Sequence, residues 1–267
     1  MARAAAGKLR RGIDVGGAEV KRLCYAVQAG GRPWSVHRMS RKEIADQLTE
    51  PDQNPPDFQD RFLTREQVER YRDRYTVGRR GPVHRKEQVA LAELRTSVRP
   101  VDTALDIPCG TGGLSPILAN AARQVILADG SSVMLEVARE DHPQLNARYL
   151  LSRAEKIHLP DNSVQIAFCH RLFHHLRNRT LRTQVLAELA RVSRRYVILS
   201  YFPASFRTRF RWFLRRLLGI GNEEMGPVSL RAFLDETHAA GLRLLRSTKI
   251  RRFPASAFFL FEQTRCD

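Results

Sequence analysis

The chain has 267 residues, of which 43% are hydrophobic, so it is long enough to form one large or two small domains around a substantial core. This composition excludes wholesale disorder. Because 45 Lys and Arg residues outnumber 28 Asp and Glu residues, the formal net charge is +17, which predicts attraction to an anionic partner such as nucleic acid or a phospholipid surface.

The positive charge is concentrated in three stretches of the chain. Residues 1–42 hold ten basic and two acidic side chains, residues 191–218 hold eight arginines and no acid, and residues 243–252 add five basic side chains. The rest of the chain is slightly acidic. The sequence therefore predicts an ordinary central domain to which basic surface has been added.

The four cysteines are widely spaced and form no C-x-x-C pair; they are Cys24, Cys109, Cys169 and Cys266. This spacing argues against a zinc site or a disulfide framework, so we expect no metal and a reducing, cytoplasmic compartment. No apolar run approaches the roughly 20 residues that span a bilayer. The basic N-terminus also lacks the apolar core of a signal peptide.

The N-terminal third predicts helices that follow an irregular arm. Residues 1–39 have no clean periodicity and contain the loop signal AGGRP at 29–33, so we interpret them as a flexible basic arm, with a short hairpin as the alternative. Residues 40–83 are expected to form a helical extension. The runs SRKE at 40–43 and TREQ at 64–67 have capping-box spacing, and each predicts the start of a helix.

From about residue 84 the pattern predicts an α/β domain that extends to residue 267. A helix is expected over 84–95, with Val89, Leu91 and Leu94 among its apolar positions. Strands are predicted at 103–107, 124–128, 147–151, 164–169 and 196–201, and helices at 114–122, 132–139 and 179–192. A helix at 229–239 that ends at Gly241, and strands near 242–248 and 257–261, complete the pattern. The predicted fold is a Rossmann-like, doubly wound sheet of seven mostly parallel strands with an N-terminal helical extension.

The first strand of this domain leads into a glycine-rich turn, DIPCGTGG at 106–113. Ligands of such sheets bind beyond the carboxyl ends of the strands, and glycines let the backbone turn sharply and approach a ligand. Asp129 ends the second strand, where an acidic side chain suits the two hydroxyls of a ribose. The dinucleotide fingerprint is incomplete, because Ser115 stands in the place of its third glycine, and there is no triphosphate-binding loop.

Four segments together resemble the class I S-adenosylmethionine-dependent methyltransferases, particularly the small-molecule type related to ubiquinone-biosynthesis enzymes. They are LDIPCGTGG at 105–113, ILADGSSVMLEVARE at 126–140, AEKIHLPDNS at 154–163 and FCHRLFHHL at 168–176. The resemblance covers roughly residues 84–262. It implies an enzyme that takes S-adenosylmethionine as its cofactor and transfers the methyl group to an acceptor.

The resemblance also implies a role for individual residues. Asp106 would lie near the methionine ammonium, Gly110 and Gly112 would give the backbone room, and Asp129 would accept the ribose hydroxyls. The other cofactor-binding residues that it implies are Pro108 and Gly130 in the two turns, Ser131 and Met134 beside the adenine, Ala154 and Glu155 at the adenine edge, and His170 at the methionine end.

Two positions depart from the family's pattern. Arg153 stands where the family usually has Asp, and Gln165 stands where Asp commonly opens the fourth strand. Either change could weaken cofactor binding, which keeps open the alternative of a non-catalytic binding protein on a methyltransferase fold.

His174 and His175 follow the fourth strand, where an acceptor would approach. Either is a candidate catalytic base for O-methylation, because histidine titrates near working pH. The alternative is that one of them only holds the loop by hydrogen bonding, since positioning by itself can supply much of the rate of such a transfer.

Residues 205–219 predict a basic amphipathic insert helix with apolar side chains on one face and arginines on the other. Three interpretations remain open: contact with an anionic membrane surface, a lid whose arginines meet a phosphate, or a helix packed on its own domain. We expect a small-molecule or lipid-linked acceptor and, under the first interpretation, peripheral attachment to the inner face of the membrane. An RNA methyltransferase that uses the basic arm and the insert is the less favoured alternative, because no RNA-binding module is recognisable.

Overall fold

The computed structural model describes residues 24–27, 35–38, 64–176, 178–202, 210, 228–251 and 256–264. The helix expected to begin at 40–43 lies outside these residues, and so does the insert helix at 205–219 apart from Phe210. Within the N-terminal 39 residues, Cys24–Val27 (β1) and Ser35–Arg38 (β2) pair as antiparallel strands, which is the arrangement of the alternative hairpin.

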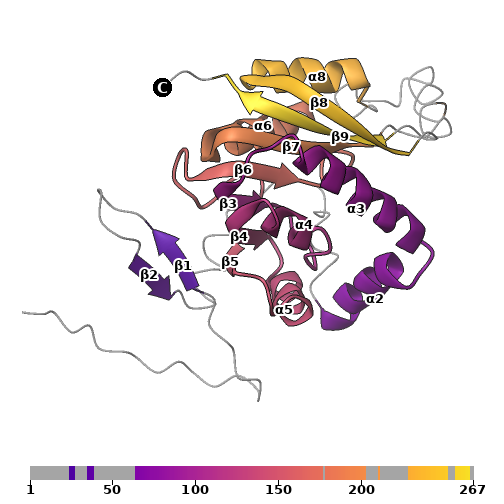
Figure 1. The fold of residues 1–267 in the computed structure, drawn as a ribbon, viewed down its shortest axis with the longest axis vertical. Helices are drawn as coiled ribbons and strands as arrows, with labels where there is room; N and C mark the ends of the chain where they lie inside the picture. The colour runs from indigo at the N-terminus through magenta and orange to yellow at the C-terminus, as the bar shows by residue number, and fades with distance from the viewer. Residues whose placement is uncertain are drawn as a thin grey trace, which may run out of the picture.

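Seven strands form the central sheet, in the order β5-β4-β3-β6-β7-β9-β8 (Figure 1). They are Val101–Asp106 (β3), Ala122–Asp129 (β4), Ala147–Leu151 (β5), Val164–Cys169 (β6), Ser193–Tyr201 (β7), Leu242–Arg251 (β8) and Ser256–Gln263 (β9). Neighbours from β5 to β7 are parallel, whereas β9 is antiparallel to both β7 and β8. The predicted seven-stranded, mostly parallel sheet is confirmed.

Several helices begin or end at the local signals that the sequence carries. They are Arg65–Thr76 (α2), Gly81–Arg95 (α3), Ser115–Ala119 (α4), Ser132–Asp141 (α5), Arg179–Val192 (α6) and Leu230–Ala239 (α8). Thr64 caps α2 through the predicted capping box with Gln67, and Gly241, with a φ of +78°, follows the end of α8. The helix predicted over 114–122 is shorter than expected, because Ala122 already pairs with Val101 as the first residue of β4.

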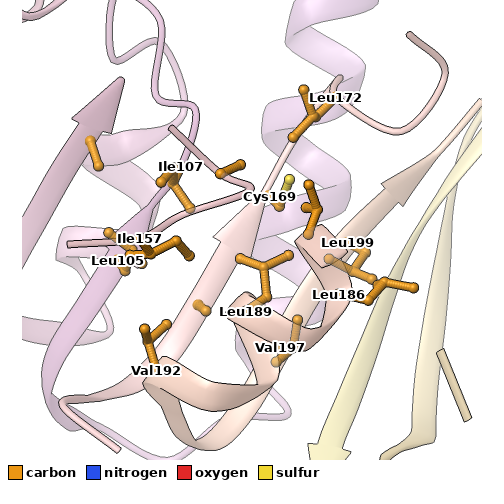
Figure 2. Close-up of a cluster of buried hydrophobic side chains, with 14 of the residues drawn as sticks. Leu105, Ile107, Ile157, Cys169, Leu172, Leu186, Leu189, Val192, Val197 and Leu199 are labelled. Atoms are coloured by element: carbon orange, nitrogen blue, oxygen red, sulfur yellow. The ribbon is translucent and has the colours of Figure 1, made fainter. Parts of the chain in front are cut away.

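Helices cover both faces of the sheet. On one face, Leu186 and Leu189 of α6 pack against residues of β3 and β7, including Leu105 and Leu199 (Figure 2). On the other face, Leu91 and Leu94 of α3 pack with Ile166, Phe168 and Ile198. Strand β6 is buried on both sides, which explains the apolar run IAFC at 166–169. Val89 of α3 is 69% exposed and does not join the core.

The connections between the strands place β4 and β6 on either side of β3. From β3 the chain passes through α4 to β4 on one side, then returns past β3 to β6 on the other. The carboxyl ends of these strands carry Asp106, Asp129 and His170 to one edge, at the point where the strand order reverses. No helix among the described residues is long and apolar enough to cross a membrane.

Candidate active site

The glycine-rich turn after β3 has little side-chain cover at the carboxyl edge of the sheet. Gly110 and Gly112 have φ angles of +55° and +76°, in the left-handed region that favours glycine. A Cβ on Gly112 would lie 2.8 Å from His142 Cδ2, so a larger residue cannot fit without movement. A Cβ on Gly110 would meet only Tyr71 Cε1, at 3.8 Å, among the described residues. A ligand can therefore approach the backbone closely at Gly110.

Asp129 connects the turns that follow β3 and β4. Its Oδ2 accepts a hydrogen bond from the Gly110 amide (2.9 Å), and its Oδ1 accepts one from the Ser131 amide (2.9 Å). Burial raises the pKa of Asp129 to about 6, although the amides of Ser131, Gly110 and Gly130 oppose this rise. Because each carboxylate oxygen keeps a further lone pair, the side chain can accept bonds from two neighbouring hydroxyls.

Asp106 is a buried carboxyl with a single neutral side-chain donor. It is 2% exposed, and its Oδ2 accepts a hydrogen bond from Ser115 Oγ (2.6 Å). Burial and the nearby charge of Asp129 raise the pKa of Asp106 to about 7, while the Ser115 bond opposes the rise. No cationic side chain among the described residues pairs with it. Such a carboxyl suits a cationic group supplied by a ligand.

The turns after β4 and β5 lie side by side. Asp129 pairs with Leu151, and the Ser152 amide donates to the Asp129 carbonyl (3.0 Å), so Ala154 and Glu155 follow close to the end of β4. Ser131 caps α5 by accepting a bond from the Met134 amide (3.3 Å). The predicted residues of the ribose and adenine side therefore meet in one region. Pro108, joined to Ile107 by a cis peptide bond, stands in the turn after β3.

Arg153 and Gln165, the two departures from the family pattern, lie in different parts of the structure. Arg153 forms an ion pair with Glu155, at the edge that carries the candidate site. The Gln165 side chain accepts a hydrogen bond from the Thr103 amide (2.8 Å). Thr103 precedes Asp106 by three residues, or about 10 Å of strand. Gln165 therefore supports the pairing of β3 and β6 at some distance from the candidate site.

Helices α2 and α3 reach over the glycine-rich turn, which the sequence did not indicate. Val68 of α2 packs against Met134 of α5, and Arg72 pairs with Asp141 (3.3 Å). Tyr71 then lies against Gly110, as described above, and a Cβ on Gly113 would come within 3.0 Å of the His84 ring of α3. The capping box predicted where α2 begins, but only its packing on α5 places Tyr71 at the turn.

A buried ion pair joins α3 to the loop after β6. Glu87 is fully buried and accepts two hydrogen bonds from the Arg171 guanidinium, one of them 3.2 Å from Nε. Arg171 has a φ of +56°, an uncommon left-handed conformation for a residue with a side chain. Its amide donates to Ser200 Oγ (2.8 Å), and its guanidinium lies 3.7 Å from the centre of the Tyr75 ring. These contacts hold the beginning of the loop in one strained conformation.

Two histidines complete this buried group. His84 Nδ1 and His170 Nε2 lie 3.5 and 3.6 Å from the Glu87 carboxylate oxygens. Burial by itself would raise the pKa of Glu87, but contacts with His170 and His84 and the charge of Arg171 hold it below its usual range. Burial lowers the pKa of His170 to about 4, so its ring is neutral at pH 7. Neither His170 ring nitrogen has a hydrogen-bond partner within the part of the chain that the structure describes.

His174 and His175 lie in the exposed turn that follows this loop, with their rings 3.9 Å apart. Loss of hydration, together with the charges of His175, His170 and Arg171, lowers the pKa of His174 to about 3. This lowering disfavours His174 as a proton acceptor near pH 7. The role of either histidine as a catalytic base stays a prediction.

Comparison with known proteins agrees with this geometry. Residues 104–195 match the methyltransferase domain family. The chain contains a class I S-adenosylmethionine-dependent methyltransferase domain. The cofactor of this methyltransferase is S-adenosylmethionine. No curated protein matches the sequence, and the ubiquinone-biosynthesis-like subtype stays a prediction.

Solved structures share the fold of the methyltransferase at low sequence identity. Magnesium protoporphyrin IX methyltransferase from Synechocystis PCC 6803 with bound SAH is 18% identical, with a TM-score of 0.59 over 77% of this chain and 97% of that one. The N-methyltransferase NodS from Bradyrhizobium japonicum WM9 is 12% identical, with a TM-score of 0.55 over 69% of this chain and 98% of that one. At these identities the likeness shows the fold and leaves the acceptor open.

Proposed function

We propose that the methyltransferase transfers a methyl group from S-adenosylmethionine to a small or lipid-linked acceptor at the carboxyl edge of β3, β4 and β6. The proposal rests on the position of Asp129. Turn amides fix both of its carboxylate oxygens, and it lies near Asp106, a buried carboxyl that has no cationic partner among the described residues. When bound, the cofactor supplies an activated methyl group on a positively charged sulfur. The protein has to orient it and exclude water.

The proposed roles follow from these contacts. Asp129 would accept hydrogen bonds from both ribose hydroxyls. Asp106 would face the methionine ammonium, and because Asp106 is buried, the attraction between the two opposite charges would be favourable. Gly110 and Gly112 would admit the cofactor to the backbone of the turn. The other proposed cofactor contacts are those implied by the resemblance, at Pro108, Gly130, Ser131, Met134, Ala154, Glu155 and His170.

The preference for a small acceptor rests on α2 and α3. Tyr71 lies against Gly110 and His84 lies against Gly113, so helices of this chain cover the turn where the methyl group would be held. Such a cover favours a single small molecule or one extended chain over a folded nucleic acid. Membrane contact through residues 205–219 is a separate proposal, because that segment, apart from Phe210, lies outside the described residues.

Cofactor binding at pH 7 is expected to release up to about half a proton from Asp106. Because its pKa is about 7 in the free protein, the carboxyl is about half protonated there, and a ligand ammonium favours its ionised form. Calorimetry in two buffers with different ionisation enthalpies measures this release. At pH 8.5, where Asp106 is already ionised, the release should disappear. Net proton uptake at pH 7 would contradict the placement of the ammonium.

The acceptor class can be tested with the full chain and methyl-labelled S-adenosylmethionine. We expect micromolar binding of the cofactor and label in the small-molecule or lipid fraction of a cell extract, with none for Asp129→Ala. Label that enters RNA instead would support the RNA methyltransferase alternative and overturn the proposed acceptor class. Absence of binding at millimolar S-adenosylmethionine would support the non-catalytic alternative.

A further inference from the structure

The corner between α2 and α3 gathers basic side chains. Residues 74–86 contain five basic residues and no Asp or Glu; the basic residues are Arg74, Arg79, Arg80, Arg85 and Lys86. We call these five the basic corner. All five are exposed, and none forms an ion pair with another residue that the structure describes.

The other arginines of α2 behave differently. Arg65 pairs with Glu69 and Glu140, and Arg72 pairs with Asp73 and Asp141. These arginines fasten α2 to its own surface and to α5. The basic corner makes no such ion pairs within the part of the chain that the structure describes, so the repulsion among its charges is a cost that a ligand could relieve.

The basic corner lies beside the candidate active site. The charge of Arg80 is the smallest of the five contributions that lower the pKa of His174. Tyr75, within the same turn, contacts the Arg171 guanidinium and lies edge-on to the His84 ring, 6.5 Å between centres. The corner thus borders the loop on the acceptor side.

Nearby acids do not cancel this charge. Glu87 follows the corner directly, but it is fully buried and its charge is matched by Arg171. Asp106 and Asp129 face the cofactor side of the edge, where the bound cofactor brings its own positive charge. The N-terminus of the 15-residue helix α3 adds a partial positive charge at the same corner.

We propose that the basic corner binds a phosphate group of the acceptor and so selects phosphate-bearing acceptors. The inference rests on the proposed function. Arginine guanidinium groups match phosphate oxygens in pairs, and four of the five side chains are arginines. The phosphate can belong to a lipid headgroup or to a soluble phosphate ester, and the corner recognises the chemistry that both share.

The test uses the full chain saturated with S-adenosylhomocysteine and two probes, inorganic pyrophosphate and dihexanoyl phosphatidic acid below its micelle concentration. Binding is followed by calorimetry and by the NMR signal of the His174 ring. In Arg79→Gln/Arg80→Gln we expect the Kd of the bound probe to rise at least about tenfold, equivalent to about 1.4 kcal/mol. Both substituted side chains are exposed, so thermal unfolding should be unchanged.

The matched control is Arg194→Gln/Arg195→Gln, an adjacent exposed pair at the start of β7, at the opposite end of the parallel strands. It removes the same charge, and we expect its Kd to change less than twofold. Equal binding of both probes would assign a soluble phosphate, and tighter binding of the phosphatidic acid would assign a lipid headgroup. Equal losses in the two variants, or no binding of either probe to the wild type, would overturn the inference. Failure of the wild type to bind S-adenosylhomocysteine would instead count against the proposed function.

Discussion

Replacement of Asp129 by alanine is expected to weaken S-adenosylmethionine binding by about 100-fold or more, because hydrogen bonds to a charged acceptor contribute about 1.5–3 kcal/mol each. The substitution removes the acceptor proposed for both ribose hydroxyls. It also frees the amides of Gly110 and Ser131, which the carboxylate holds in place, so the two turns lose their connection. Calorimetry with S-adenosylmethionine measures the change in Kd.

Asp129→Asn separates the charge from the shape of the side chain. An asparagine has one oxygen and one amide nitrogen, so either Gly110 or Ser131 would face another donor in place of an acceptor. We therefore expect this variant to bind nearly as poorly as Asp129→Ala. Asp102→Asn is the control, because Asp102 is exposed and pairs with Arg123 on the surface. Wild-type affinity in Asp129→Ala would show that the ribose is bound elsewhere.

Glu87→Gln is expected to lower the free energy of unfolding by about 3–5 kcal/mol, because it leaves a buried charge without its partner. The uncompensated charge is that of Arg171, whose left-handed backbone the ion pair also supports. The pKa of Glu87 is held below its usual value, so its contribution to stability is complete above about pH 4.5 and is lost as the pH falls toward the lowered pKa. Denaturant unfolding of wild type and variant at several pH values measures the difference.

A second buried ion pair provides the control for this prediction. Glu236 of α8 accepts two hydrogen bonds from Arg182 of α6, at 2.9 and 2.7 Å, on the face of the sheet away from α3. Glu236→Gln should lose a comparable amount of stability. Only Glu87→Gln should shift the ring signals of His84 and His170 in NMR spectra, since both rings face Glu87. Unchanged stability in Glu87→Gln, or identical histidine shifts in the two variants, would contradict the structural role given to Glu87.

Much of the fold and the core of the candidate site follow from local sequence. The capping box at Thr64 predicts the start of α2 because the reciprocal bonds join residues three apart, and Gly241 predicts the end of α8 because glycine adopts a positive φ at low cost. Asp106 and Asp129 could be paired as site residues because each ends a strand of a parallel sheet. The length of α4 could not be predicted, since the pairing of Ala122 with Val101 competes with the helix.

The residues that sequence reasoning missed depend on contacts between distant segments. Glu87 and Arg171 are 84 positions apart, and no local pattern relates them. The pKa of His174 also depends on which charged groups the fold brings around it, and no local pattern identifies these groups. Gln165 departed from the family's pattern in the sequence, yet the structure uses it in strand pairing with Thr103.

The sequence by itself determined the order of strands and helices, the glycine-rich turn and the two carboxylates beside it, because each depends on residues a few positions apart. Only the tertiary structure decided which basic side chains are free to act. The number of charged residues follows from the sequence, but whether an arginine is neutralised depends on the acidic residues that packing places next to it. Arg72 is paired across α2 and α5, whereas Arg80, whose charge acts on His174 in the loop after β6, forms no ion pair with a residue that the structure describes.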